Sequence, residues 1–250
     1  MPAALSVAVH RRDADFVGRG QPPVVLIHGF ASSAAEDFHA TGWTAGLAAA
    51  GVASHAVDLP GHGSAGPIGV DGGCSVPALI ARLSAIVDGA AASSGCGAVD
   101  VIGYSLGARL AWELPGAGSP VRRMVLGGLS PVEPFAALDP GAVAAAVADP
   151  GAAADPLVSM LASMVSAPGR DSESLIRLMA ALGERPFSPQ AGRPAVPLLA
   201  VAGSGDPVAG DAGWVAESVP GARVLSVPGD HRGALLAPEF REAAIAFLAS

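Results

Sequence analysis

The sequence predicts an α/β fold: a mostly parallel sheet flanked by helices, with a small helical cap inserted. Short apolar runs alternate with longer helical patterns, as in parallel strands joined by helical crossovers. One long segment breaks this alternation and contains helical patterns only. Of 250 residues, 51% are hydrophobic and 14% are charged, a composition that excludes a disordered chain or a coiled coil. The length suits one α/β domain with a modest insertion.

Each apolar run is expected to be one strand. Residues 24–27 read VVLI, a continuous β-branched run of the kind that a strand buried on both faces requires. Residues 5–9 alternate and are expected to form an antiparallel edge strand. The other strands are expected at residues 52–57, 99–102, 124–126, 198–202 and 223–227.

Helical patterns lie between these runs. The pattern at residues 238–249 begins with Pro238, which is tolerated in the first turn because its missing N–H has no partner there. The other crossover helices are expected at residues 41–50, 76–91, 108–114 and 211–219.

The insertion is expected at residues 131–194, where helical patterns are separated by Pro and Gly. Asp155 and Pro156 have the form of an N-cap and first helical residue, and lead a helix over 157–166. A second helix is expected over 172–182, ended by Gly183 in the left-handed position. We assign residues 1–130 and 195–250 to the core and 131–194 to a cap over the carboxyl ends of the strands.

Charge and cysteine content exclude several kinds of partner. The net charge is −8 and no basic stripe is present, which argues against nucleic acid. Cys74 and Cys96 flank a predicted helix of about 15 residues, which spans roughly 22 Å. Bridged Cα atoms lie within about 7 Å, so we expect two free thiols. The six His residues are scattered, without the spacing of metal ligands, and no metal or other cofactor is expected.

Hydropathy gives an expectation for location. No stretch of 18 strongly apolar residues lacks Gly, Pro or charge, so no membrane-spanning helix is expected. Residues 1–9 have no basic residue before their short apolar run and do not resemble a signal peptide. We therefore expect a cytoplasmic protein.

The strongest candidate for chemistry is the segment Gly103-Tyr104-Ser105-Leu106-Gly107, which follows one predicted strand and opens a helical run. A nucleophile elbow needs this context, because its Ser lies in a strained turn between a strand and a helix. The glycines on either side of the Ser let the chain make this turn without Cβ clashes. The chain contains 33 Gly, so the motif alone could be a turn with an incidental Ser. Its position between strand and helix favours the elbow.

Four other turns place polar residues just past the ends of predicted strands, where open α/β sheets carry their sites. Two of them end in Asp206 and His231. The four segments are His28-Gly29-Phe30, Asp58-Leu59-Pro60-Gly61-His62-Gly63, Gly203-Ser204-Gly205-Asp206 and Gly229-Asp230-His231.

These five segments, in this order, resemble the α/β-hydrolase superfamily over nearly the whole chain. The resemblance implies that Ser105 is the nucleophile, His231 the base and Asp206 the acid that orients the base. It also implies an oxyanion hole made by the backbone N–H groups of Phe30 and Leu106. The insertion at 131–194 matches the place where the family carries its cap.

Some assignments stay open from the sequence. Glu133 follows the earlier strand, where some relatives keep their acid, and Asp211 lies on the same connection as Asp206. His28 and His62 are expected to shape turns rather than to transfer protons. Tyr104 is expected to pack beside the nucleophile.

The cap helices carry apolar stripes at the spacing i, i+3, i+4, i+7. Such stripes serve mainly as packing faces, and they also offer lining for an acyl pocket, with Met160, Met164 and Met179 as pocket candidates. The pocket is expected to be apolar except at its catalytic floor. The stripes are Leu157, Met160, Leu161, Met164 and Leu175, Leu178, Met179, Leu182.

The expected function is hydrolysis of carboxylic esters with uncharged, short-to-medium acyl groups through an acyl-enzyme. A thioesterase or a C–C bond hydrolase with the same triad is the alternative, because one fold hosts several reactions. A ligand-binding homologue without catalysis is the remote alternative. The expected partner is a small ester or related acyl compound, and the sequence does not indicate an oligomeric state.

Overall fold

The computed structural model describes residues 5–15, 20–70, 73–152 and 155–250. Residues 1–4, the start of the N-terminal segment considered above, lie outside the described residues. In the described part, a seven-stranded sheet has the order β1-β3-β2-β4-β5-β6-β7. The predicted fold class is confirmed. The strands are β1 (Ala8–Arg12), β2 (Val24–Ile27), β3 (Ser54–Asp58), β4 (Val99–Tyr104), β5 (Val121–Gly127), β6 (Leu198–Gly203) and β7 (Arg223–Val227).

All neighbouring strands are parallel except β1, which pairs antiparallel with β3. β2, β4 and β6 are buried along their whole length. The apolar sequences of β2 and β6 require this burial, and the one charged residue of β4, Asp100, pairs with Arg122. The edge strand begins at Ala8, three residues later than the expected range 5–9. Its last three residues, His10 to Arg12, are polar, and an edge strand tolerates them because one side of it faces water.

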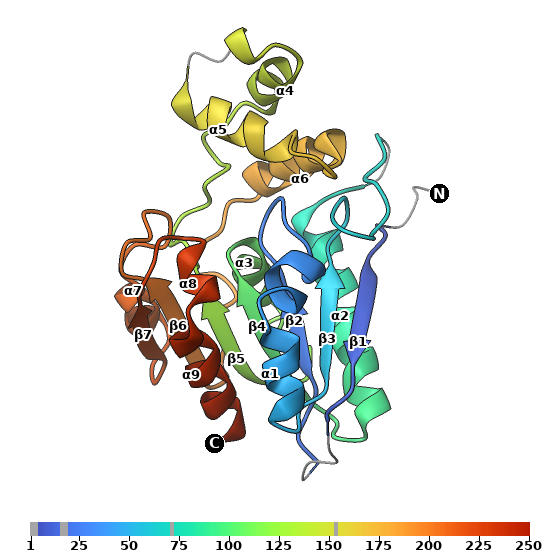
Figure 1. The fold of residues 1–250 in the computed structure, drawn as a ribbon, viewed down its shortest axis with the longest axis vertical. Helices are drawn as coiled ribbons and strands as arrows, with labels where there is room; N and C mark the ends of the chain where they lie inside the picture. The colour runs from blue at the N-terminus through green and yellow to red at the C-terminus, as the bar shows by residue number, and fades with distance from the viewer. Residues whose placement is uncertain (1–4, 16–19, 71–72, 153–154) are drawn as a thin grey trace.

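Helices cover both faces of the sheet (Figure 1). α1 (Trp43–Ala49), α8 (Gly233–Leu236) and α9 (Pro238–Ala249) pack with β2, β4 and β5 in one buried cluster. α2 (Val76–Ser94), α3 (Leu106–Ala111) and α7 (Gly213–Ser218) contribute to a second cluster on the opposite face.

By length and composition α2 could cross a membrane, with 19 residues and a mean hydropathy of 1.3. Its residues Val76, Leu79, Leu83 and Val87 are buried in the same cluster as the sheet. The apolar face of α2 is therefore part of the interior of the domain.

The segment between β5 and β6 contains α4 (Pro140–Ala148), a one-turn 3₁₀ helix (Pro150–Ala152), α5 (Pro156–Val165) and α6 (Ser172–Glu184). These helices lie beyond the carboxyl ends of the strands (Figure 1). The Asp155 side chain caps α5 by accepting from the Leu157 N–H at 2.8 Å, with Pro156 next in sequence. Asp139 and Pro140 begin α4 in the same way, although no helix was expected there.

The expected end of the second cap helix is wrong. Gly183 lies inside α6, which continues to Glu184, so it is not a left-handed cap. A Cβ at this position would lie 2.9 Å from the carbonyl oxygen of Phe135. The glycine allows the 133–136 segment to approach α6 closely.

Candidate active site

Ser105 lies in the tight turn between β4 and α3. Its φ is 52° and its ψ −115°, a region that residues with a Cβ seldom adopt. The Ser105 N–H donates to the Gly127 carbonyl at 2.8 Å, which ties the turn to β5. The strained conformation expected of a nucleophile elbow is present.

The two glycines of the motif provide space for this turn. A Cβ on Gly107 would lie 1.9 Å from the carbonyl oxygen of Ile27, and a Cβ on Gly103 would lie 2.6 Å from that of Gly107. Side chains at either position would push α3 away from β2 and β4. The glycines therefore let the helix N-terminus pack directly against the sheet.

His231 joins Ser105 to Asp206. Its Nε2 lies 2.9 Å from Ser105 Oγ, and its Nδ1 lies 2.8 Å from Asp206 Oδ2. A carboxylate only accepts hydrogen bonds, so Nδ1 donates to Asp206 and Nε2 is left to accept from the Ser105 hydroxyl. The three side chains come from segments that follow β4, β6 and β7.

The Asp206 carboxylate is held from both sides. Its Oδ1 accepts from the N–H groups of Val208 at 2.8 Å and Ala209 at 3.0 Å. Burial acts to raise the pKa of Asp206, but the hydrogen bonds from His231 and from these N–H groups outweigh it, so its pKa is lowered. Asp206 therefore stays ionised at neutral pH.

The two alternative acids lie elsewhere. Glu133 pairs with Arg109, at 3.2 Å between Nε and Oε2, and Asp211 accepts from the Gly213 N–H at 2.9 Å. Of the three acids considered, Asp206 alone contacts His231.

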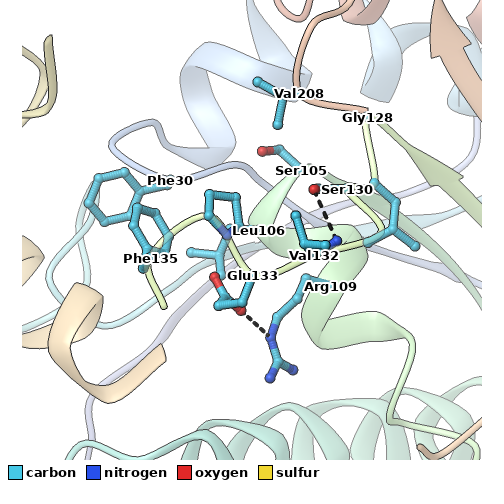
Figure 2. Close-up of a pocket in the computed structure, with 12 residues that line it drawn as sticks. Phe30, Ser105, Leu106, Arg109, Gly128, Ser130, Val132, Glu133, Phe135 and Val208 are labelled. Carbon is cyan, nitrogen blue, oxygen red and sulfur yellow. Dashed lines mark hydrogen bonds and ion pairs between the residues drawn. The ribbon is translucent and has the colours of Figure 1, made fainter. Parts of the chain in front are cut away.

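The candidate oxyanion donors, the N–H groups of Phe30 and Leu106, belong to two residues that line the cavity beside Ser105 (Figure 2). Within the described residues, neither N–H donates a backbone hydrogen bond in a turn or loop. Leu106 is the first residue of α3, and the N–H groups at a helix N-terminus favour negative charge.

Two buried histidines hold the turn that carries Phe30. His62 Nε2 accepts from the Ala31 N–H at 3.1 Å, and His28 Nε2 accepts from the Leu59 N–H at 3.1 Å. Burial lowers the pKa of both, that of His62 to about 3, with the neighbouring His28 adding to the effect. Both rings are therefore neutral at pH 7, and the structure places them in turns as expected.

Three further residues support the site: Asp37, Arg232 and Tyr104. The sequence did not identify them in this role. The Asp37 carboxylate accepts from the Gly29 N–H at 2.9 Å and also pairs with Arg232. It thus joins the turn before Phe30 to the residue after His231. Tyr104 donates its hydroxyl proton to the His231 carbonyl. Nothing in the sequence pattern pairs residues this far apart in the chain.

The cavity beside Ser105 has a volume of about 50 Å³. Most of its wall comes from residues 128–135, and Phe30 and Leu106 complete it, with the Phe30 ring against that of Phe135 (Figure 2). The three methionines proposed for the pocket are not part of its lining. Met160 and Met164 are 51% and 38% exposed, while Met179 is buried in the core, so the pocket assignment of all three is corrected.

The error for α5 has a clear origin. Two stripes on α5 have the same spacing and are shifted by one residue relative to each other. They are Leu157, Met160, Leu161, Met164 and Val158, Leu161, Ala162, Val165. The second stripe is the buried one. On α6 the expected stripe Leu175, Leu178, Met179 and Leu182 is buried throughout.

The pocket is also less apolar than expected. Arg109 and Glu133 both line it, although both side chains are nearly inaccessible to solvent. Burial raises the pKa of Glu133, against the opposing effect of Arg109. A buried ion pair therefore lies at the wall of the pocket, away from the Ser105–His231–Asp206 group.

Cysteines and metal ligands take no part in this arrangement. Cys74 and Cys96 are both free thiols. Within the described part of the chain, no group of three or more His, Cys, Asp or Glu residues could hold a metal ion.

Comparison with known proteins identifies the family. The sequence model of the alpha/beta hydrolase family matches residues 24–246 of the chain. The search of curated proteins gave no match.

Three solved structures resemble the chain over almost all of its length. An esterase from Exiguobacterium antarcticum is 18% identical, with a TM-score of 0.69 and 100% of both chains covered. An esterase from Rhodococcus sp. ECU1013 is 23% identical, with a TM-score of 0.67 and 98% of this chain and 95% of that chain covered. The enol-lactonase from Burkholderia xenovorans LB400 is 20% identical, with a TM-score of 0.65 and coverages of 97% and 96%. At these identities the likeness is one of fold.

Proposed function

Because the chain belongs to the α/β-hydrolase family, we propose that it is a serine hydrolase that cleaves carboxylic esters of uncharged, short-to-medium acyl groups. The observation that carries the proposal is the hydrogen-bonded chain from Asp206 through His231 to Ser105. Ser105 at the end of this chain borders a cavity. A hydroxyl paired with a base that is itself oriented by a carboxylate is the arrangement that activates a Ser nucleophile.

In the proposed reaction, Ser105 Oγ attacks the ester carbonyl carbon while His231 Nε2 takes the hydroxyl proton. The carbonyl oxygen becomes an oxyanion, which the N–H groups of Phe30 and Leu106 stabilise. The intermediate collapses, the C–O bond to the alcohol breaks, and His231 returns the proton to the leaving oxygen. Water, deprotonated by His231, then attacks the acyl carbon. The bond from that carbon to Ser105 Oγ breaks, the carboxylic acid is released, and His231 returns the proton to Ser105 Oγ.

The lining of the cavity supports an uncharged acyl group. Its side chains are mainly apolar, and its one cation and one anion, Arg109 and Glu133, already pair with each other. A charged acyl group would lose its hydration without gaining an unpaired partner, which is costly in a desolvated pocket.

The test is a panel of 4-nitrophenyl esters from acetate to decanoate, with matched thioesters. We expect saturable hydrolysis of the esters by the wild type. Ser105→Ala should lower kcat by on the order of 10⁶-fold, down to the residual rate that binding and the oxyanion hole provide. Circular dichroism should show that the variant is folded.

Hydrolysis of thioesters with a much higher kcat/KM than of esters would assign the thioesterase alternative instead. A wild-type protein that hydrolyses none of these compounds would contradict the proposed function.

A further inference from the structure

A cluster of three ion pairs joins α3 to both ends of the inserted segment. Arg109, on α3, contacts Glu133 Oε2 through Nε at 3.2 Å, Glu113 Oε1 through Nη1 at 2.6 Å, and the Arg185 carbonyl through Nη2 at 3.1 Å. The Arg185 guanidinium in turn contacts Glu113 Oε2 at 3.1 Å. Glu133 precedes α4 and Arg185 follows α6, so Arg109 holds the entry and the exit of the insertion.

The same arginine is tied to the nucleophile turn. Arg109 lies on α3, and its backbone N–H donates to the Ser105 carbonyl at 3.0 Å. Its guanidinium lies 5.7 Å from the Phe187 ring centre. Only 6% of the Arg109 side chain and 2% of the Glu133 side chain are exposed. The position of the pair is therefore fixed relative to Ser105.

We propose that the Arg109–Glu133 ion pair sets the closed end of the acyl pocket and thereby limits the length of the acyl chain. The inference rests on the proposed ester hydrolysis and narrows it to short acyl groups. Both residues line the cavity, and Figure 2 shows them joined below Leu106 and Val132, with Ser105 on the other side of those residues. Most of that wall is the 128–135 segment, which Glu133 anchors to α3.

Two physical reasons make this pair a barrier. A longer chain would have to separate or desolvate a buried ion pair, and leaving one buried charge without its partner is strongly unfavourable. The cavity, at about 50 Å³, is also far below the roughly 300–1,000 Å³ of pockets for larger ligands. We therefore expect wild-type kcat/KM to fall sharply between butyrate and octanoate esters.

The experiment replaces the pair by apolar side chains of similar length, in the double variant Arg109→Met/Glu133→Leu. Glu113 keeps Arg185 as its partner. The milder variant Glu133→Ala removes one carboxylate and leaves Arg109 paired with Glu113. Each newly accommodated methylene contributes up to about four-fold in kcat/KM. The octanoate-to-butyrate ratio of kcat/KM should therefore rise at least about ten-fold in either variant.

The matched control is Arg122→Met/Asp100→Leu. It removes another ion pair with a buried carboxylate, 2.5 Å between Nη2 and Oδ2, at the opposite end of β4 from Ser105. This control should leave the octanoate-to-butyrate ratio unchanged.

Three results would overturn the proposal. One is an unchanged ratio in a folded Glu133→Ala or double variant that still hydrolyses butyrate. Another is an equal shift in the control. The third is a wild type that already hydrolyses octanoate esters as well as butyrate esters. Absence of all ester hydrolysis in the wild type would instead contradict the proposed function itself.

Discussion

Ala31 and Ser105 are the two non-glycine residues with positive φ in the described part of the chain, at 51° and 52°. Each is the neighbour of one proposed oxyanion donor, since Ala31 follows Phe30 and Ser105 precedes Leu106. Left-handed backbone at a residue with a Cβ persists only where surrounding contacts enforce it. Here the contacts are from His62 Nε2 to the Ala31 N–H and from the Ser105 N–H to Gly127.

Asp206 permits a sharp test at the residue scale. Asp206→Asn keeps the shape of the side chain but removes the charge that orients His231 and stabilises its protonated form. We expect kcat on a butyrate ester to fall by on the order of 10⁴-fold, with a smaller change in KM.

The control is Asp211→Asn on the same connection, an exposed acid that should keep wild-type kcat. A modest loss in Asp206→Asn, or an equal loss in Asp211→Asn, would remove Asp206 from the proposed role.

At the scale of the element, the turns after β2 and β3 support each other. The turn after β2 carries Phe30 and the turn after β3 carries His62. The two turns are linked because the Ala31 N–H donates a hydrogen bond to His62 Nε2. The other ring nitrogen of His62, Nδ1, contacts the Pro60 carbonyl at 2.9 Å. The ring must be neutral to accept from Ala31.

This requirement predicts sensitivity to acid. The pKa of His62 is about 3 in the folded protein because of burial, against about 6.5 in an unfolded chain. The stabilisation of the fold by neutral His62 is fully present above about pH 6.5, and it is lost progressively as the pH falls towards 3. By pH 5 the loss is about 2 kcal/mol.

The measurement is urea unfolding of the wild type and His62→Gln at pH 7 and pH 5. Gln offers an acceptor for Ala31 and a donor for Pro60 without titrating. On acidification from pH 7 to pH 5, we expect the free energy of unfolding to fall by about 2 kcal/mol more in the wild type than in the variant. Equal losses in the two proteins would show that His62 does not supply this pH dependence.

The elements themselves were predictable to different degrees. β2 and β6 are apolar throughout and were predicted within a residue of their observed ends. The buried face of α5 was not predicted, because two stripes of equal spacing compete on one helix and only tertiary packing selects between them. Gly183 could not be assigned either, since its role depends on Phe135, far away in sequence.

For the whole molecule, the sequence predicted the fold class and the segments that meet at the site. The reason is topological: polar residues that follow parallel strands gather at one edge of the sheet. The structure brings Ser105, His231 and Asp206 into contact in this way, while their catalytic roles remain the proposal. The Arg109–Glu133 pair and the Asp37–Arg232 pair could not be predicted, because no short-range pattern relates their members.

The most direct test of the account is labelling of Ser105 with a fluorophosphonate, followed by intact-protein and peptide mass spectrometry. The account predicts one adduct per chain, located on Ser105. The adduct should be absent in Ser105→Ala and should form far more slowly in His231→Ala, because the hydroxyl then lacks its base. No adduct on the folded wild type, an adduct on another residue, or an equal rate in His231→Ala would contradict the assignment of Ser105 as an activated nucleophile.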